Sequence, residues 1–206
     1  MTAPAYWPTA CAELGARDAV MAGLIARYPD AVLGHRGDAF QTLARAIVGQ
    51  QISVKAADRV WARLVDTLPA VSPAALADLA PDALAGCGLS QRKREYLVDL
   101  ARHFVDKRID PARWRHRDDA AVIAELTDVR GIGRWTAEMF LIFFLHRPDV
   151  WPVDDIGLQK AVAAHYLGGE RAGIGALREL GERLRPWRTV ATWYLWRSLD
   201  PVIVQY

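Results

Sequence analysis

Residues 126–137 read LTDVRGIGRWTA and predict a helix, a glycine hairpin and a second, apolar helix. Gly131 and Gly133 permit a positive φ and a close approach to the backbone, and the amides that open the second helix can bind a phosphate. Arg130 and Arg134 add positive charge at the same end. A single Gly-x-Gly pair is also typical of an ordinary turn between helices, so the rest of the chain has to separate these interpretations.

The composition is that of a folded protein and does not by itself identify a partner. The chain has 206 residues, 52% of them hydrophobic, which suffices for one domain or two closely packed lobes. A net charge of +2 with a pI near 8.6 permits a nucleic-acid partner without demanding one. Residues 91–117 hold nine Arg and Lys against four acids. This excess fits a phosphate-facing surface and a solvated helix face equally well.

The cysteines and the apolar segments exclude several classes of protein. Cys11 and Cys87 are too few and too isolated for a zinc site, an iron–sulfur cluster or a disulfide framework, so we expect reduced structural thiols. The N-terminus lacks the pattern of a signal peptide, and the longest apolar stretch, residues 139–145, is far shorter than a membrane span. We therefore expect a cytoplasmic protein with no membrane partner.

Helical periodicity dominates the chain. Residues 40–48 and 54–64 carry apolar side chains at helical spacing on either side of a polar corner, GQQIS at 49–53, in which Ser53 is a candidate N-cap. Further helices are expected after Ser72-Pro73, Pro81, Ser90 and Asp118 or Asp119, and over about 156–168, 175–184 and 187–199. No alternating strand pattern has comparable strength, so the predicted fold class is all-α.

Five groups of residues in a fixed order make the chain resemble the helix–hairpin–helix base-excision DNA glycosylases, and most closely their DNA-3-methyladenine glycosylase II branch. They are IVGQQISVKAA (47–57), CGLSQRKREY (87–96), VRGIGRWTA (129–137), WPVDD (151–155), and RPWR (185–188) with YLW (194–196). The resemblance covers nearly all of residues 40–200. It implies a single glycosylase domain of two helical lobes with a DNA-facing cleft between them. We place one lobe at about residues 40–147 and the other at 1–39 plus 148–206.

The resemblance also implies the partner and the residues that contact it. The partner would be double-stranded DNA containing damaged bases, bound by a monomer at a bacterial-type nucleoid. The implied DNA contacts are Arg130, Gly131, Ile132, Gly133, Arg134 and Thr136 at the hairpin, and Gln50, Gln51 and Ser53 at the corner. No cofactor is required and no iron–sulfur cluster is expected. The backbone carbonyls of Val129 and Ile132 would hold a monovalent cation, Na or K, that meets a DNA phosphate.

Asp155 is the expected catalytic carboxylate. Both Asp154 and Asp155 lie where a helix starts, so either could merely cap it. The residues that follow Asp155 fit the family's pattern better, and we assign a capping or supporting role to Asp154. Cleavage of an N-glycosidic bond develops positive charge on the sugar, which a carboxylate stabilises while it orients or deprotonates water.

Aromatic side chains complete the predicted site. In relatives that also cut the strand, the residue after Gly-Ile-Gly-Arg is a lysine that forms a Schiff base, whereas this chain has Trp135. By resemblance Trp135 and Trp196 line a pocket in which a cationic alkylated purine can stack, and Met139 and Ile156 lie beside it. Relatives often carry tyrosine where this chain has Met139.

Base flipping requires a side chain to fill the gap in the duplex, which points to Gln51, with Gln50 second. A buried polar link between helices is the alternative for both glutamines. We therefore expect a monofunctional glycosylase that removes alkylated bases, chiefly 3-methyladenine, and leaves an abasic site. The alternatives are a non-catalytic helix–hairpin–helix DNA-binding module and a glycosylase for oxidised or mismatched bases.

Overall fold

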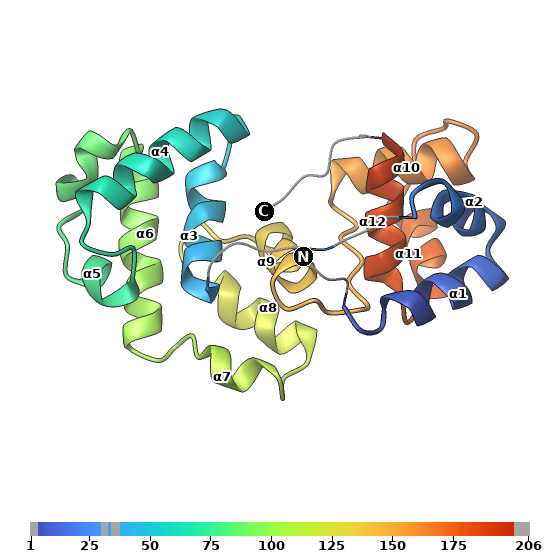
Figure 1. Cartoon of the computed structure of the whole chain (residues 1–206), viewed down its shortest axis with the longest axis horizontal. Helices are drawn as coiled ribbons and strands as arrows, with labels where there is room; N and C mark the ends of the chain where they lie inside the picture. Colours follow the sequence, from blue (N-terminus) through green and yellow to red (C-terminus); the bar gives the residue numbers. More distant parts are fainter. Residues whose placement is uncertain (1–3, 30–32, 34–37, 200–206) are drawn as a thin grey trace. The chain divides into compact units, whose positions relative to one another are not determined.

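The computed structural model describes residues 4–29, 33 and 38–199, and every regular element in these residues is a helix (Figure 1). The all-α prediction is therefore confirmed. In chain order the elements are α1 (Trp7–Arg17), α2 (Ala19–Arg27), α3 (Ala39–Gly49), α4 (Val54–Thr67), α5 (Pro73–Ala77), the 3-10 helix η1 (Pro81–Cys87), α6 (Gln91–Val105), α7 (Pro111–Trp114), α8 (Asp119–Thr127), α9 (Arg134–Phe143), α10 (Ile156–Tyr166), α11 (Ile174–Arg183) and α12 (Arg188–Leu199).

The described residues form two compact units. One combines the residues before position 35 with those from Leu141 onward, and the other holds residues 38–140. The change of unit falls inside α9, whereas the sequence analysis placed it at residue 147. The sequence of an apolar helix gives no local signal for such a boundary. Phe140 lies before the boundary and Phe143 after it, and both side chains are buried.

In the unit of residues 38–140, α3 and α6 lie side by side (Figure 1). They run antiparallel, since Phe40 at the start of α3 meets Phe104 at the end of α6, edge to face with ring centroids 5.3 Å apart. α4 packs on α3 and η1, and α5 packs on α6. The end of α3 is thereby brought beside the start of α6, which matters for the site.

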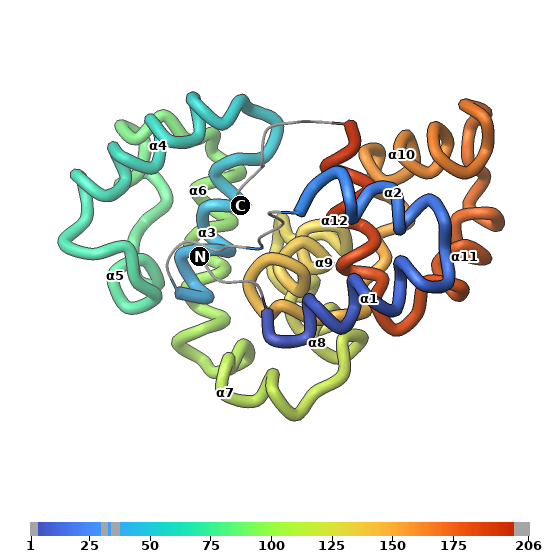
Figure 2. The backbone as a smooth tube through the Cα atoms, turned by 45° about the vertical axis from the view of Figure 1, so that its right-hand side comes forward, coloured from blue at the N-terminus to red at the C-terminus, as the bar shows by residue number. Residues whose placement is uncertain are grey.

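In the other unit, α12 is the central helix. Residues 189–195 of α12 are all buried, as expected for a helix that is covered on every side. α1, α2 and α10 pack against it, and Figure 2 shows the two N-terminal helices beside it. Trp7 of α1 meets Trp193 of α12 edge to face at 5.8 Å. The N-terminal segment thus completes the core around the C-terminal helix.

The helix starts are largely those predicted. Ser53, Ser72, Ser90 and Asp118 each accept a hydrogen bond from the amide three residues on, which confirms the caps and selects Asp118 over Asp119. The helix expected at Pro81 is a 3-10 helix, and α1, α2 and α7 were not predicted. No helix in the described part of the chain has the length and hydropathy that a membrane crossing needs.

Candidate functional site

Asp155 is the N-cap of α10, and its Oδ1 atom accepts a hydrogen bond of 2.6 Å from the amide of Leu158. The same oxygen accepts a second hydrogen bond, of 2.7 Å, from Nε1 of Trp196 on α12. The assignment of the cap to Asp154 is therefore wrong. The amide of Asp155 donates to the carbonyl of Pro152 at 2.9 Å, and this turn puts Asp155 directly before the helix and leaves Asp154 exposed.

The indole of Trp196 is held in place on its other side. It stacks on Phe143, with ring centroids 5.9 Å apart and planes 8° from parallel. Gly157 makes room for it, because a Cβ at that position would lie 3.1 Å from Cδ1 of the indole. Asp155, Trp196 and the exposed Ile156 are thus brought together within one unit.

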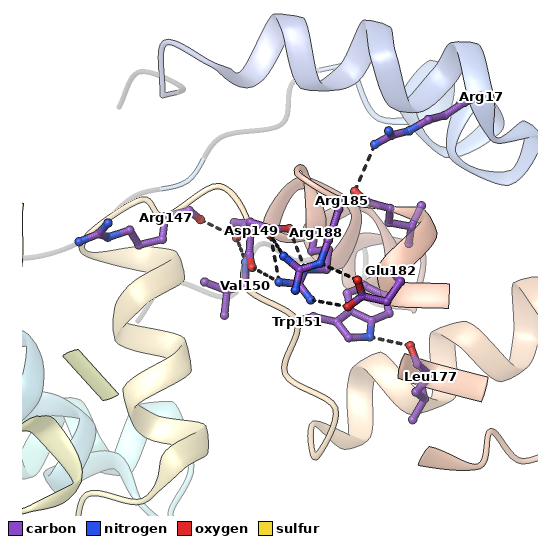
Figure 3. Close-up of polar contacts among 11 residues, drawn as sticks. Arg17, Arg147, Asp149, Val150, Trp151, Leu177, Glu182, Arg185 and Arg188 are labelled. Atoms are coloured by element: carbon purple, nitrogen blue, oxygen red, sulfur yellow. Dashed lines mark hydrogen bonds and ion pairs between the residues drawn. The ribbon is translucent and has the colours of Figure 1, made fainter. Parts of the chain in front are cut away.

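The loop that leads to Asp155 is tied to α12 by an ion-pair cluster (Figure 3). Arg188 donates to both carboxylate oxygens of Asp149, at 2.7 and 3.0 Å, and to the Asp149 carbonyl at 2.9 Å. Arg185 donates to the same carboxylate at 3.0 Å and to Glu182 at 2.8 Å. Such a bidentate arginine pair constrains geometry as well as adding energy.

The next two residues of this loop are also bound. The amide of Val150 donates to Oγ1 of Thr189 at 3.0 Å. Nε1 of Trp151 donates to the Leu177 carbonyl at 2.8 Å, and its ring lies so near Gly181 that a Cβ there would be 2.7 Å away (Figure 3). The chain is therefore held at three successive residues shortly before Asp155.

The hairpin is shaped by one of its two glycines. Gly131 has a φ of +87°, and a Cβ on it would lie 2.1 Å from Cδ2 of Tyr96, so no other residue fits. Gly133 does not use the positive φ that a glycine permits, since it is not among the left-handed residues. A Cβ at Gly133 would meet nothing within 4 Å. Ile132 between them is buried and anchors the turn.

Side chains of helix α6 form hydrogen bonds to the hairpin. The amide of Arg130 donates to Oδ2 of Asp99 at 2.9 Å, and its guanidinium donates to Glu95 at 3.2 Å. Asp128, just before the hairpin, bonds to Arg108 and at 3.3 Å to the buried His103. The hydrogen bond from Arg108, followed by the one from His103, lowers the pKa of Asp128. The hairpin is thus fixed by side chains that the sequence analysis did not assign to it.

The polar corner meets the hairpin directly. Nε2 of Gln50 donates to the carbonyl of Gly131 at 2.8 Å, which is the linking role considered as the alternative for the glutamines. Gln51 is exposed and has a φ of +58°, in the left-handed region that a glutamine rarely adopts. Ser53 caps α4 through a 3.3 Å bond from the Ala56 amide.

The other two residues that the sequence analysis assigned to a pocket lie on α9, in the unit of residues 38–140. Trp135 is 38% exposed in the first turn, whereas Met139 one turn later is 4% exposed and Thr136 is buried. Arg134 pairs with Glu138 at 2.9 Å along the same helix.

The basic segment at 91–117 is not one continuous cationic surface. Most of its charges are bound to acids or backbone carbonyls within the chain, which argues against a phosphate-facing surface. The bound residues are Lys93, Arg94, Arg102, Arg108, Arg113 and Arg117. Cys11 and Cys87 are free thiols, and in the described residues no three metal-binding side chains lie together.

Comparisons with known proteins identify relatives of the chain. Residues 44–186 match the model of the HhH-GPD superfamily, described as base excision DNA repair protein. DNA-3-methyladenine glycosylase 1 of Schizosaccharomyces pombe is 32% identical over 164 residues, which are 77% of this chain and 72% of that one. The chain spans between 41% and 76% of the length of the curated relatives it matches.

Solved structures show the same fold. A DNA-3-methyladenine glycosidase from Bacillus halodurans superposes with a TM-score of 0.82 at 35% identity, over 90% of this chain and 86% of that one. A 3-methyladenine DNA glycosylase from Schizosaccharomyces pombe, solved in complex with abasic DNA, has a TM-score of 0.75 at 27% identity, over 92% and 96% of the two chains.

Proposed function

Because the chain belongs to the HhH-GPD superfamily of base excision DNA repair proteins, we propose that it is a monofunctional DNA glycosylase. Its substrates are alkylated bases, chiefly 3-methyladenine, in duplex DNA, and its product is an abasic site. The names of its relatives support this substrate class. The relative solved with abasic DNA supports DNA as the partner.

The observation that carries the proposal is the position of the Asp155 carboxylate. Its Oδ1 atom is bound by Leu158 N and Trp196 Nε1, so the carboxylate is held in one orientation beside an aromatic ring. A pure DNA-binding module needs neither the fixed carboxylate nor the indole. This pairing therefore favours catalysis over binding alone.

The reaction follows from the charge of the substrate. A purine alkylated at N3 or N7, such as 3-methyladenine, is cationic in the nucleotide, and when the C1′–N bond breaks its electron pair leaves with the base, which becomes neutral. The sugar takes on the positive charge, and Asp155 stabilises it electrostatically. Water then attacks C1′ and loses a proton, for which Asp155 is the acceptor at hand. Trp196 and Trp135 offer indole faces on which a cationic base can stack.

DNA would be held at the hairpin and opened at the corner. The amides at the start of α9, with Arg130 and Arg134, suit a phosphate. Gln51, exposed at the corner, is the side chain to fill the gap left by the flipped base. The Ile132 amide donates to the Val129 carbonyl at 3.1 Å, so Val129 and Ile132 share one tight turn. Their neutral oxygens suit a monovalent cation such as Na or K, which would offset phosphate charge there.

We also propose that the protein acts as a monomer, at the nucleoid of a bacterial-type cytoplasm. A monomer suits a single lesion in duplex DNA, which presents one asymmetric target. The location is that of the proposed partner, the DNA of such a cell.

The substitution Asp155→Asn tests the function. Asparagine is as good an N-cap as aspartate and still accepts from Leu158 and Trp196, so the variant loses charge and keeps its fold. We expect single-turnover release of the damaged base to fall at least about 100-fold. Binding to a duplex with a stable abasic analogue, followed by fluorescence anisotropy, should be retained.

The matched control is Asp154→Asn, which removes the neighbouring, exposed carboxylate. It should release bases at the wild-type rate. A panel of single-lesion duplexes with 3-methyladenine, 7-methylguanine, 1-methyladenine, ethenoadenine or hypoxanthine would define the substrates. Undiminished release by Asp155→Asn, or no release of any lesion by the wild type, would overturn the proposal.

A further inference from the structure

Lys93 makes two contacts that no sequence motif explained. Its Nζ atom, near the start of α6, donates to the carbonyl of Val48 at 2.8 Å and to that of Gln50 at 2.7 Å. Val48 lies among the last residues of α3, whose carbonyls lack partners within the helix. The ammonium thus caps the C-terminal end of α3, where a positive charge is favoured.

The bond to Gln50 bears on the exposed residue that follows. The Gln50 carbonyl belongs to the same peptide plane as the Gln51 amide, so fixing that plane restricts φ of Gln51. Gln51 has a φ of +58°, a conformation that costs a non-glycine residue free energy and persists only where its surroundings impose it. Lys93 supplies such a constraint.

The corner is also tied to the hairpin through the side chain of the same residue. Nε2 of Gln50 donates to the Gly131 carbonyl at 2.8 Å. Tyr96, one turn beyond Lys93 on α6, packs against Gly131. One face of α6 therefore sets both the corner and the hairpin, and Gln50 joins the two.

The position of Lys93 favours this role over direct DNA contact. Its side chain is half-buried, and this burial lowers the pKa of Lys93. Two of its three N–H donors point at backbone carbonyls inside the chain. A lysine that binds a DNA phosphate would instead extend its ammonium group into solvent.

We propose that Lys93 is a positioning residue for base flipping, which holds Gln51 in the strained conformation that points it at the DNA stack. The proposal rests on the proposed function, because it assumes that the duplex is opened at the corner. It predicts a defect in opening the base pair and none in breaking the glycosidic bond.

The test compares Lys93→Met on two substrates with the same lesion, chosen as one that the wild type releases. In the first the lesion is paired in a duplex, and in the second it lies in an unpaired bulge, where little pairing energy opposes flipping. We expect the single-turnover rate of Lys93→Met to fall about tenfold or more on the paired lesion and by less than about threefold on the bulged one. A misfolded or generally weakened variant would lose both activities alike.

Lys55→Met is the matched control, since Lys55 is exposed on α4 and loses the same charge without touching the corner carbonyls. It should keep the wild-type ratio between the two substrates. An equal loss by Lys93→Met on both substrates, no loss on either, or the same pattern in Lys55→Met would each overturn the role of Lys93.

A second measurement needs no catalysis. 2-Aminopurine placed opposite a stable abasic analogue fluoresces more strongly when a side chain enters the stack. We expect the wild type to raise this signal and Lys93→Met to raise it less than half as much at saturating protein; an equal rise would overturn the proposal. If the wild type releases no base yet the signals differ as expected, the proposed function fails and the positioning role stands.

Discussion

Asp155 combines two roles in one side chain. Its Oδ1 atom caps the N-terminus of α10 by accepting from the Leu158 amide, and it also accepts the indole N–H of Trp196. The cap alone would leave the carboxylate able to turn about its side-chain bonds. The indole adds a donor from a helix far away in sequence, so the direction of the carboxylate depends on how α10 packs on α12.

Removing this donor while keeping the ring should slow base release. In Trp196→Phe the ring can still stack on Phe143, but the hydrogen bond to Asp155 is lost. A hydrogen bond to a charged group contributes about 1.5–3 kcal/mol, so we expect single-turnover release to fall between about tenfold and 100-fold. Abasic-DNA binding should change little.

Trp187→Phe provides the matched comparison. Nε1 of Trp187 donates to Glu13 at 2.6 Å, so the same indole-to-carboxylate bond is removed elsewhere in the same unit. This variant should release bases at the wild-type rate. Full activity of Trp196→Phe would show that Leu158 alone orients the carboxylate.

At the level of single residues, the sequence placed the helix cap on the wrong aspartate. The pattern that follows Asp155 predicts which carboxylate is catalytic, and that role stays a prediction, whereas a cap depends on which residue precedes the first helical one. That boundary is decided by the turn from Pro152 to Asp155, which local signals do not resolve. The hydrogen bonds of Lys93 could not be predicted from the sequence, because the two carbonyl partners lie 43 and 45 residues away along the chain.

At the level of elements, the loop before α10 is ordered by its contacts rather than by secondary structure. Arg188 binds Asp149 from the first position of α12, and Thr189 beside it binds Val150 (Figure 3). The first turn of α12 therefore holds the beginning of this loop, and Trp196, two turns later, meets Asp155 at its end. One helix sets both the path of the loop and the orientation of the carboxylate.

Arg188→Lys tests the contribution of this clamp. Lysine keeps the positive charge but cannot bind both Asp149 oxygens and the carbonyl at once. We expect the free energy of unfolding, measured by urea denaturation, to fall by about 1–3 kcal/mol. The rate of base release should fall by a larger factor than the affinity for abasic DNA, because the loop positions Asp155 and contains no residue of the hairpin.

Arg178→Lys is the control for this change, since Arg178 is exposed on the neighbouring helix α11. It should leave stability and activity unchanged. An Arg188→Lys variant as stable and as active as the wild type would mean that Thr189 and Trp151 suffice to hold the loop.

Helices were predictable where a cap and an apolar period coincide, as for α3, α4 and α6. The N-terminal helices carried usable signals as well: Pro8 lies in the first turn of α1, and Asp18 caps α2 by accepting from the Met21 amide. Their place beside α12 had no such signal, because it depends on aromatic contacts between the two ends of the chain, such as Trp7 with Trp193.

At the level of the whole molecule, most basic side chains of the segment 91–117 are paired within the chain, so the net charge says little about any one surface. The net charge is only +2, and most basic residues in the segment 91–117 are bound to acids or carbonyls inside the chain. Arg130 and Arg134 at the hairpin are paired in the same way, with Glu95 and Glu138. Neither the net charge nor the number of basic residues in a segment therefore identifies a phosphate site.

The same molecule-wide view predicts which chemistry is absent. The chain has four lysines, and none stands where strand-cutting relatives place theirs, because that position is Trp135. Lys93 is bound to carbonyls, Lys55 and Lys160 are exposed on α4 and α10, and Lys107 lies just past α6. Schiff-base chemistry needs an amine within reach of the sugar carbon.

We expect no protein–DNA adduct when borohydride is added to the enzyme with a duplex containing an abasic site, and damaged strands should break only on treatment with hot alkali. Trp135→Lys restores an amine at the start of α9 and should give a trapped adduct on the same abasic duplex. An adduct with the wild type would require an amine of the protein to reach the sugar and would refute the monofunctional assignment.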